Sequence, residues 1–193
     1  MHDDLGSGLS AIHLLSNYLS DNAEEKYPEF TSEVNKIRKS SEDLNQSIRE
    51  IIWTVNTKDD TLSSLALFIR RYAHELQENA KIPIHVQMEN PMPEIQLNGV
   101  QRKHLFLCVK EAINNAIKHG KPEVINVNIQ IENENMISIK IQDNGKGFDL
   151  GQSNQRNSGN GLKNIKERMG EIGGLAQFES GEKGTTVLLQ IKV

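Results

Sequence analysis

The chain has 193 residues, of which 36% are hydrophobic and 25% charged, and its formal net charge is −4. This composition predicts a soluble protein of one large or two modest domains, and it has no basic stripe of the kind that nucleic-acid partners need. The single cysteine, Cys108, excludes an internal disulfide and favours a reducing, cytoplasmic compartment. Because it lies in the apolar run LFLCV, we expect a buried core thiol.

Residues 1–57 have the pattern of two helices joined by a short connection. Pro28 suits the first turn of a helix but not its interior, so we place the connection at residues 22–28. Apolar or small residues recur at steps of four and three in both helices: Leu5, Leu9, Ile12, Ser16 and Leu19, then Phe30, Val34, Ile37, Ser41, Leu44, Ile48, Ile51 and Val55. Such long heptad seams favour pairing with a second copy as a four-helix bundle, and a monomeric hairpin packed on the rest of the chain is the alternative.

The helical pattern is already under way within a few residues of Met1, with no capping signal before it. We therefore expect the chain to be a piece of a longer protein. Any sensor or membrane segment would lie outside it, because no stretch of this chain approaches the apolar length of a membrane span.

The rest of the chain alternates between helical and strand patterns, after a polar stretch at Asn56–Asp60 that we interpret as a linker. The predicted helices lie at 61–80, 99–118 and 162–172, and the predicted strands at 82–88, 124–132, 136–143, 175–180 and 185–193. Residues 133–135 are expected to form a hairpin turn. The fold class is therefore α+β: a helical domain at 1–57, then a domain at 58–193 with one mixed or antiparallel sheet covered by helices on one face.

The predicted helix 99–118 has a polar face near its end. Glu111, Asn115 and Lys118 follow at spacings of four and three, so they share a side of a regular α-helix. A carboxylate, an amide and a cation in this order suit Mg²⁺ bound to a polyphosphate. A solvated polar face is the commoner use of such residues, but this face belongs to a helix whose other side is strongly apolar and which ends at His119–Gly120.

Three glycine clusters follow: DNGKGFD at Asp143–Asp149, GNGL at Gly159–Leu162 and GTT at Gly184–Thr186. Asp143 ends a predicted strand, where its carboxylate can accept a hydrogen bond from an exocyclic amine while the glycines let a ligand approach the backbone. Taken alone, DNG is most often a simple turn. GNGL precedes a helix, and the free N–H groups of a helix N-terminus form a phosphate site.

The order ExxxNAxKH, DxGxG, GxGL and GTT resembles the ATP-binding domain shared by histidine kinases, type II topoisomerases, mismatch-repair ATPases and heat-shock chaperones. The resemblance covers residues 60–193 and implies a Bergerat α/β sandwich that binds ATP with Mg²⁺. By this resemblance Asn115 would coordinate Mg²⁺, Glu111 would orient a water or the metal ligands, and Asp143 would hold the adenine amine. Lys118 and His119 would approach the phosphates.

The same resemblance assigns roles to the glycine clusters. Gly145, Gly147, Gly159 and Gly161 would shape and hinge a lid over the nucleotide, with Leu162 counted among the nucleotide-binding residues. Thr185 would lie near the adenine by way of a water.

His2 and Asp3 open the first heptad helix as HDDL. A phosphoacceptor needs an accessible imidazole, and an adjacent carboxylate can orient the ring and accept its proton. HDDLGSGLSAI, the hairpin and IREIIWTVN together resemble the dimerisation and phosphoacceptor domain of NarX/DesK-type histidine kinases over residues 1–57. The resemblance implies phosphorylation of His2 with help from Asp3. Ser7 departs from the glutamine usual at its position, which is implicated in dephosphorylating the partner.

The two resemblances predict the cytoplasmic catalytic core of a two-component sensor histidine kinase. It would act as a homodimer, phosphorylate His2 with ATP and Mg²⁺, and pass the phosphoryl group to an aspartate of a response regulator receiver domain. One alternative is an ATP-binding dimeric signalling module that transfers nothing. Another is a serine kinase or conformational ATPase of the same superfamily, which has no need of HDDL on a dimerising helix.

Overall fold

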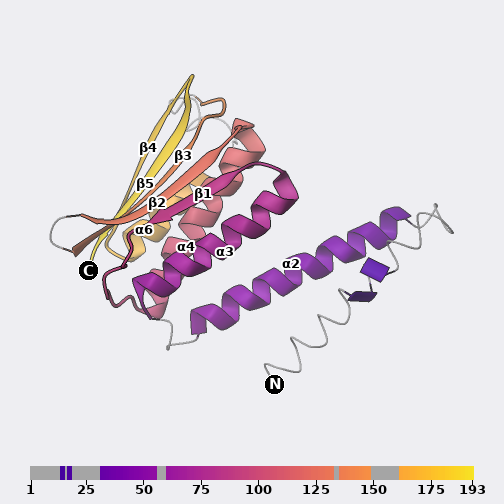
Figure 1. The fold of residues 1–193 in the computed structure, drawn as a ribbon, viewed down its shortest axis with the longest axis horizontal. Helices are drawn as coiled ribbons and strands as arrows, with labels where there is room; N and C mark the ends of the chain where they lie inside the picture. The colour runs from indigo at the N-terminus through magenta and orange to yellow at the C-terminus, as the bar shows by residue number, and fades with distance from the viewer. Residues whose placement is uncertain (1–13, 16, 19–30, 56–59, 133–134, 149–160) are drawn as a thin grey trace. The chain divides into compact units, whose positions relative to one another are not determined.

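The computed structural model describes residues 14–15, 17–18, 31–55, 60–132, 135–148 and 161–193 (Figure 1). The contacts between residues divide the chain into two compact units, Met1–Asn56 and Thr57–Val193. Several features predicted from the sequence lie outside the described residues: His2, Asp3, Ser7, the connection at 22–28, Gly159, and most of the turn at 133–135.

The described part of the first unit is dominated by the helix α2 (Thr31–Val55), which matches the second predicted helix. Three apolar side chains on it, spaced by seven residues, remain more than half exposed: Ile37 at 56%, Leu44 at 53% and Ile51 at 59%. A line of exposed apolar residues at heptad spacing is the pattern of a helix that packs on another helix.

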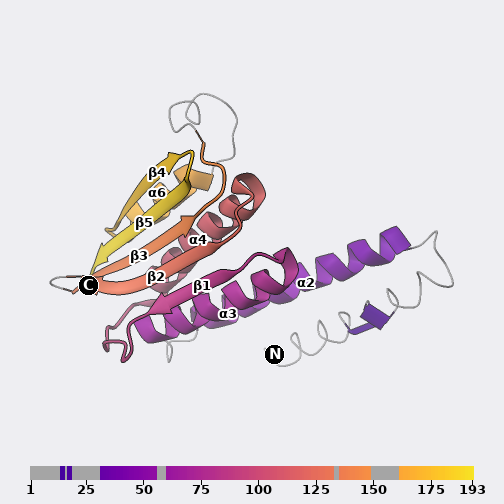
Figure 2. The same cartoon turned by 45° about the horizontal axis from the view of Figure 1, so that its top comes forward.

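The second unit is built on a five-stranded mixed sheet (Figures 1 and 2). The spatial order is β1-β2-β3-β5-β4, with β1 parallel to β2 and all other neighbours antiparallel. The strands are β1 (Ile84–Met88), β2 (Ile125–Glu132), β3 (Met136–Asp143), β4 (Leu175–Gly181) and β5 (Gly184–Lys192). Each predicted strand is present, with ends that differ by one or two residues.

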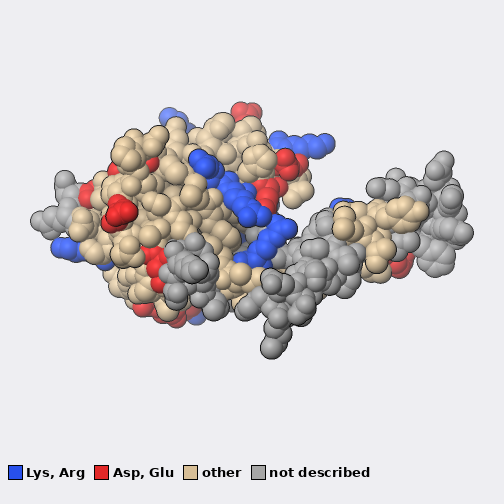
Figure 3. All heavy atoms as spheres, turned by 60° about the horizontal axis from the view of Figure 1, so that its bottom comes forward, with Lys and Arg blue, Asp and Glu red and all other residues tan. Residues whose placement is uncertain are grey.

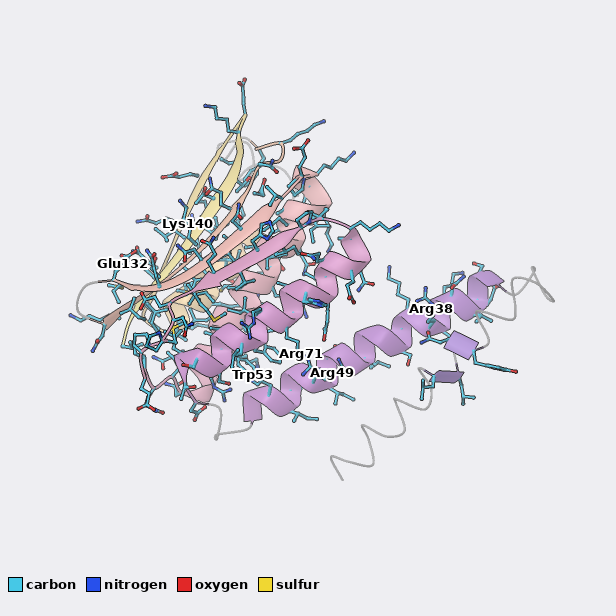
Figure 4. All side chains as sticks on the ribbon, in the orientation of Figure 1. Arg38, Arg49, Trp53, Arg71, Glu132 and Lys140 are labelled. Carbon is cyan, nitrogen blue, oxygen red and sulfur yellow. The ribbon has the colours of Figure 1, made fainter. Side chains whose placement is uncertain are left out.

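Three helices cover one face of this sheet, as Figure 2 shows: α3 (Leu62–Ala80), α4 (Gly99–Asn115) and α6 (Gly161–Glu171). The helix α3 packs on β1, α4 on β3 and β5, and α6 on β4. The strand residues beneath them are aliphatic and buried: Ile125, Val127, Ile129, Ile137, Ile139, Ile141, Val187, Leu189 and Ile191. Since successive residues of a strand face opposite sides, the intervening positions form an open face, on which Lys140 (Figure 4) is exposed. The predicted α/β sandwich is confirmed.

Two of these helices begin with side-chain caps. Thr61 Oγ1 accepts the N–H of Ser64 at 3.1 Å before α3. Before α4, Asn98 Oδ1 accepts the N–H of Gln101 at 2.9 Å, and Gln101 Oε1 accepts the N–H of Asn98 at 3.0 Å, which completes a capping box. Caps of this kind contribute about 1 kcal/mol each. Across the described residues no helix combines the length and apolar character that crossing a bilayer requires.

Asp60, the last residue of the stretch predicted as a linker, makes its contacts within the second unit. Its Oδ1 lies 2.7 Å from the Arg102 Nη2 and 2.9 Å from the Arg102 Nε, and its carbonyl accepts the N–H of Leu97 at 2.9 Å. Arg102 is fully buried, and a buried guanidinium needs a carboxylate close by. The two partners are 42 residues apart in sequence, so local polarity could not reveal the pairing.

The predicted helix 99–118 is not one regular α-helix. It is α-helical to Asn115 and continues as a π-helical turn, η3 (Ala116–Gly120), which ends at Lys121 in the left-handed conformation with φ 50°. A π-helical turn contains more residues than an α-helical one. The spacing argument for a shared face therefore holds for Glu111 and Asn115 and ends before Lys118, which is exposed.

Charged side chains of both signs lie on the surface. Figure 3 shows basic and acidic side chains on one face of the molecule. Exposed i,i+4 pairs such as Arg71–Glu75 at 3.3 Å and Lys163–Glu167 at 3.6 Å contribute at most about 1 kcal/mol each. The buried aliphatic layer between helices and sheet is thus the main source of stability.

Candidate nucleotide-binding site

The polar end of α4 lies against the first residue of α6. Gly161 is buried, and a β-carbon placed on it would collide with the Glu111 carboxylate and lie 2.9 Å from Asn115 Nδ2. A side chain at residue 161 would displace the ends of both side chains, and in its absence two groups that the sequence predicted separately meet at one point. The arrangement sets a carboxylate and an amide beside the N-terminus of a helix, where backbone N–H groups favour anions.

Asp143 lies at the end of β3 and is only 5% exposed. Its Oδ1 accepts the N–H of Gly145 at 2.9 Å. A β-carbon on Gly120 would lie 3.3 Å from the same oxygen, and the Gly120 carbonyl accepts the N–H of Lys146 at 2.7 Å. The end of η3 and the DNGKG segment (143–147) are therefore held in contact around the Asp143 carboxylate.

The β4–β5 hairpin closes the other side of this segment. Gly184 has φ 110°, and a β-carbon there would collide with the backbone carbonyl of Asp143. Ser180 Oγ accepts the N–H of Phe148 at 2.8 Å and lies 3.2 Å from Thr185 Oγ1. The predicted GTT cluster is thereby brought beside the DNGKGF segment, with Thr185 half-buried.

Asn144 is a residue of this region that sequence reasoning missed. Its Oδ1 accepts the N–H groups of Glu123 at 2.9 Å and Val124 at 3.0 Å. These bonds tie the loop before β2 to the segment after β3. Asparagine at the end of a strand is a common acceptor for nearby backbone N–H groups, which is the signal that could have indicated this role.

Two adjacent asparagines on α4 face different helices. Asn115 lies beside Gly161 of α6, whereas Asn114 Nδ2 donates to Tyr72 Oη on α3 at 3.0 Å. Tyr72 in turn packs edge-to-face on Phe106, with ring centroids 5.4 Å apart. Asn114 therefore has a structural role, and Asn115 is the one that faces the candidate site.

The remaining residues predicted for the site lie outside the contact between Glu111, Asn115 and Gly161. Lys118 and His119 lie in η3 and are exposed, and Leu162 follows Gly161 in α6 and is half-buried. Gly147 lies so close to the backbone of Gly181 that a side chain there would collide with it.

Cys108 lies one turn before Glu111 on α4 and is fully buried. Its Sγ lies 3.7 Å from the carbonyl oxygen of Ile165. Burial raises the pKa of the Cys108 thiol from 9.0 to about 12; the charge of Arg168 opposes this shift and that of Glu111 adds to it. The thiol is therefore neutral at physiological pH, which confirms the predicted core cysteine.

The donor groups fit a nucleotide with a metal held mainly by phosphate. In the described ranges no three histidine, cysteine or acidic side chains gather into a group that could hold a metal by themselves. Asn115 offers one amide oxygen and Glu111 one carboxylate, beside a helix N-terminus. Mg²⁺ commonly takes one or two protein oxygens and completes its shell with phosphate and water, so this set suits it.

Comparisons with known proteins identify both parts of the chain. A family described as histidine kinase-, DNA gyrase B- and HSP90-like ATPase matches residues 100–193, and a family described as histidine kinase (HisKA_3) matches residues 1–60. A histidine kinase domain from the blue-light activated histidine kinase EL346 of Erythrobacter litoralis has the same fold, with a TM-score of 0.62 at 15% identity, covering 96% of this chain and 94% of that one.

Curated relatives agree with these matches. The sensor histidine kinase LiaS of Bacillus subtilis is 25% identical over 194 residues, which are 100% of this chain and 52% of LiaS. The histidine-protein kinase/phosphatase DegS of the same organism is 34% identical over 127 residues, which are 65% of this chain and 32% of DegS. This chain thus spans about half of LiaS and a third of DegS. Together these matches show the catalytic core of a HisKA_3-type sensor histidine kinase, with a HisKA_3 segment followed by an ATPase-type domain.

Proposed function

We propose that this chain is the catalytic core of a two-component sensor kinase that uses ATP and Mg²⁺ to phosphorylate His2 and passes the phosphoryl group to an aspartate of a response regulator. The observation that carries the proposal is the meeting of Glu111, Asn115 and the α6 N-terminus at Gly161. These three groups lie within the segment that matches the ATPase-type family, and HDDL lies within the segment that matches HisKA_3.

The adenine would lie at Asp143. A carboxylate can accept several hydrogen bonds, and Asp143 Oδ1 already receives the N–H of Gly145. A further bond from the exocyclic amine of adenine would select this base. Thr185, fastened beside Ser180, would hold a water at the same end of the site.

The phosphates would lie at the other end, along α4 and the start of α6. The N–H groups of Gly161 and Leu162 would bind them, and Asn115 would supply an oxygen to Mg²⁺ with Glu111 orienting the metal's waters. Lys118 and His119, both exposed on η3, would reach the phosphates from outside. Gly145, Gly147, Gly159 and Gly161 would shape the lid. ATP would supply the phosphoryl group, and Mg²⁺ would neutralise its charge.

His2 would receive the phosphoryl group. Asp3, adjacent in sequence, would hold the imidazole in its reactive tautomer and accept its proton. This assignment is supported by the HisKA_3 match, which covers residues 1–60 and so includes HDDL.

A homodimer built on residues 1–57 would bring two such helical segments together, leaving residues 58–193 as the catalytic domain. The exposed line of Ile37, Leu44 and Ile51 on α2 supports this pairing, because more than half of each side chain remains to be buried and full burial of such a side chain contributes roughly 1.5–3 kcal/mol. The relatives' description as sensor histidine kinases supports a receiver domain as the partner in transfer.

Incubation with ATP labelled on its γ-phosphate tests the proposal. The expected product is a phosphorylated chain whose label is stable in base and lost in acid, as for phosphohistidine, and which is absent in His2→Ala. An acid-stable label would instead indicate a serine kinase, and nucleotide binding without any label would indicate a binding module.

A further inference from the structure

The helices α4 and α6 lie side by side and run in opposite directions (Figure 1). Four side chains of α4 that contact α6 follow at spacings of four, three and four residues: His104, Cys108, Glu111 and Asn115. Their contacts run along α6 in reverse order, from Arg168 and Glu171 through Ile165 to Gly161. We call this line of contacts the α4–α6 seam.

His104 forms the end of the seam that lies farthest from Gly161. Its Nδ1 is 3.2 Å from the carbonyl oxygen of Arg168 and 3.1 Å from Glu171 Oε2. Both partners are acceptors, so Nδ1 must carry the proton that is shared between them. The His104 side chain is 16% exposed and that of Glu171 is 64% exposed, which makes the carbonyl contact the better shielded of the two.

The carbonyl of Arg168 is available because of the way α6 ends. Gly173 has φ 72°, and the N–H of Gly174 donates to Met169 O at 2.8 Å, which turns the chain sharply. The N–H of Ile172, which would reach Arg168 O in a regular α-helix, donates to Met169 O at 3.2 Å instead. Carbonyls of a last helical turn need donors from outside the helix, and His104 supplies one from α4.

The opposite end of α6 also packs closely on α4. Gly161 lies against the side-chain ends of Glu111 and Asn115, which a larger residue would displace. An 11-residue helix is about 16 Å long and behaves as a stiff rod. A contact that sets the position of its C-terminal turn along α4 therefore also sets the position of its N-terminal N–H groups.

We propose that His104 is a positioning residue for the nucleotide site: its hydrogen bond to Arg168 O fixes α6 along α4 and so holds the α6 N-terminus where phosphates bind. The inference rests on the proposed nucleotide site and adds to it a residue about two helical turns from Glu111 and about three from Asn115 along the seam. His104 does not touch the nucleotide. Its effect should therefore grow with the number of phosphates and leave the base unaffected.

Three variants of the full chain test this role. His104→Leu removes the donor, whereas His104→Asn places an amide N–H₂ near the position of Nδ1. His74→Leu is the matched control, because His74 is 70% exposed on α3 and pairs with Glu78 only at 3.9 Å. Calorimetric affinities for ATP, ADP and adenosine with Mg²⁺, together with melting temperatures, are the readouts.

For His104→Leu we expect ATP affinity to fall about fivefold, ADP affinity to fall less, and adenosine affinity to stay unchanged, since one hydrogen bond corresponds to a change of this size. His104→Asn should restore ATP affinity to within about twofold of the wild type, and His74→Leu should match the wild type. Unchanged ATP affinity in His104→Leu, an equal loss for adenosine, or a failure of His104→Asn to recover would each overturn the inference. A wild-type chain that binds no ATP would instead overturn the proposed function.

A measurement on the unaltered chain covers the case in which His104→Leu does not fold. Nitrogen NMR of the histidine rings at about pH 8, where an ordinary imidazole is neutral, reports which nitrogen carries the proton. We expect a proton on Nδ1 of His104. A spectrum with Nδ1 unprotonated would contradict the hydrogen bond to Arg168 O and the inference with it.

Discussion

Gly161 and Glu111 touch in the folded chain, with the backbone of the first directly against the carboxylate of the second. This contact joins the end of one helix to the start of another and creates the place where we expect phosphates to bind. It depends on the absence of a side chain at residue 161.

Replacing Gly161 by alanine should therefore weaken ATP binding. The new methyl group would collide with the Glu111 carboxylate and lie 2.9 Å from Asn115 Nδ2, so both side chains would have to turn away from the α6 N-terminus. We expect at least a tenfold loss of ATP affinity by calorimetry, equivalent to about 1.4 kcal/mol.

Gly170→Ala in the same helix is the matched control. A β-carbon on Gly170 meets nothing within 4 Å, so this change should leave ATP affinity unchanged and stabilise the helix by about 0.5–1 kcal/mol. Equal ATP affinities for the two alanine variants would show that the close approach at Gly161 does not matter for binding.

Asp143→Asn should reduce the preference for adenine. The substitution keeps an oxygen that can accept the N–H of Gly145, but it replaces the charged acceptor that we expect to hold the adenine amine. A charge-assisted hydrogen bond contributes about 1.5–3 kcal/mol, so ATP affinity should fall by roughly tenfold or more. Affinity for GTP, which lacks that amine, should change little. A parallel loss for both nucleotides would argue against the assignment.

How far the sequence predicted these features depends on the range of the interactions involved. The strict alternation in residues 125–132 and 136–143 identified β2 and β3, because one face of each strand is buried and the other is open. The glycine clusters identified the loops around Asp143, because this signal also lies in the local sequence. A single sheet with helices on one face followed from the order of these elements, whereas the choice between a mixed and an antiparallel sheet stayed open.

Contacts between distant residues were beyond the sequence. The parallel pairing of β1 with β2 joins Ile84 to Ile125, and nothing in either strand specifies the other. The different roles of Asn114 and Asn115 can be assigned only once the positions of α3 and α6 are known. The π-helical turn at Ala116–Gly120 is too short to show a periodic pattern in the sequence. His104 gives no local sign of its contact with Arg168, which lies 64 residues later.

The buried ion pair of Arg102 and Asp60 should be a major source of stability for the second unit. Asp60→Asn deprives a fully buried guanidinium of its carboxylate, and removing one partner of a buried pair costs about 3 kcal/mol or more. Urea unfolding should show this loss. Glu75→Gln, which breaks the exposed pair with Arg71, should cost less than about 1 kcal/mol. Similar midpoints for the two variants would refute the distinction.

Cys108 should be unreactive in the folded chain. Burial raises the pKa of its thiol to about 12. Thiolate is therefore scarce even at pH 9.0, which is the ordinary pKa of this group. Because the pKa is raised on folding, the thiol favours the folded state fully below pH 9.0, and this contribution is lost as pH rises from there towards 12. Maleimide labelling at neutral pH should be slow until urea unfolds the chain. Rapid labelling of the native protein would contradict the burial.

The most direct test of the central claim is the Mg²⁺-dependent affinity for ATP of Asn115→Ala, measured by calorimetry beside Asn114→Ala. The two asparagines are neighbours on one helix, but only Asn115 faces Gly161, whereas Asn114 donates to Tyr72. The account predicts that Asn115→Ala loses Mg²⁺-dependent binding while it stays folded, and that Asn114→Ala binds ATP normally but unfolds about 1 kcal/mol more easily. Normal binding by Asn115→Ala would contradict the account.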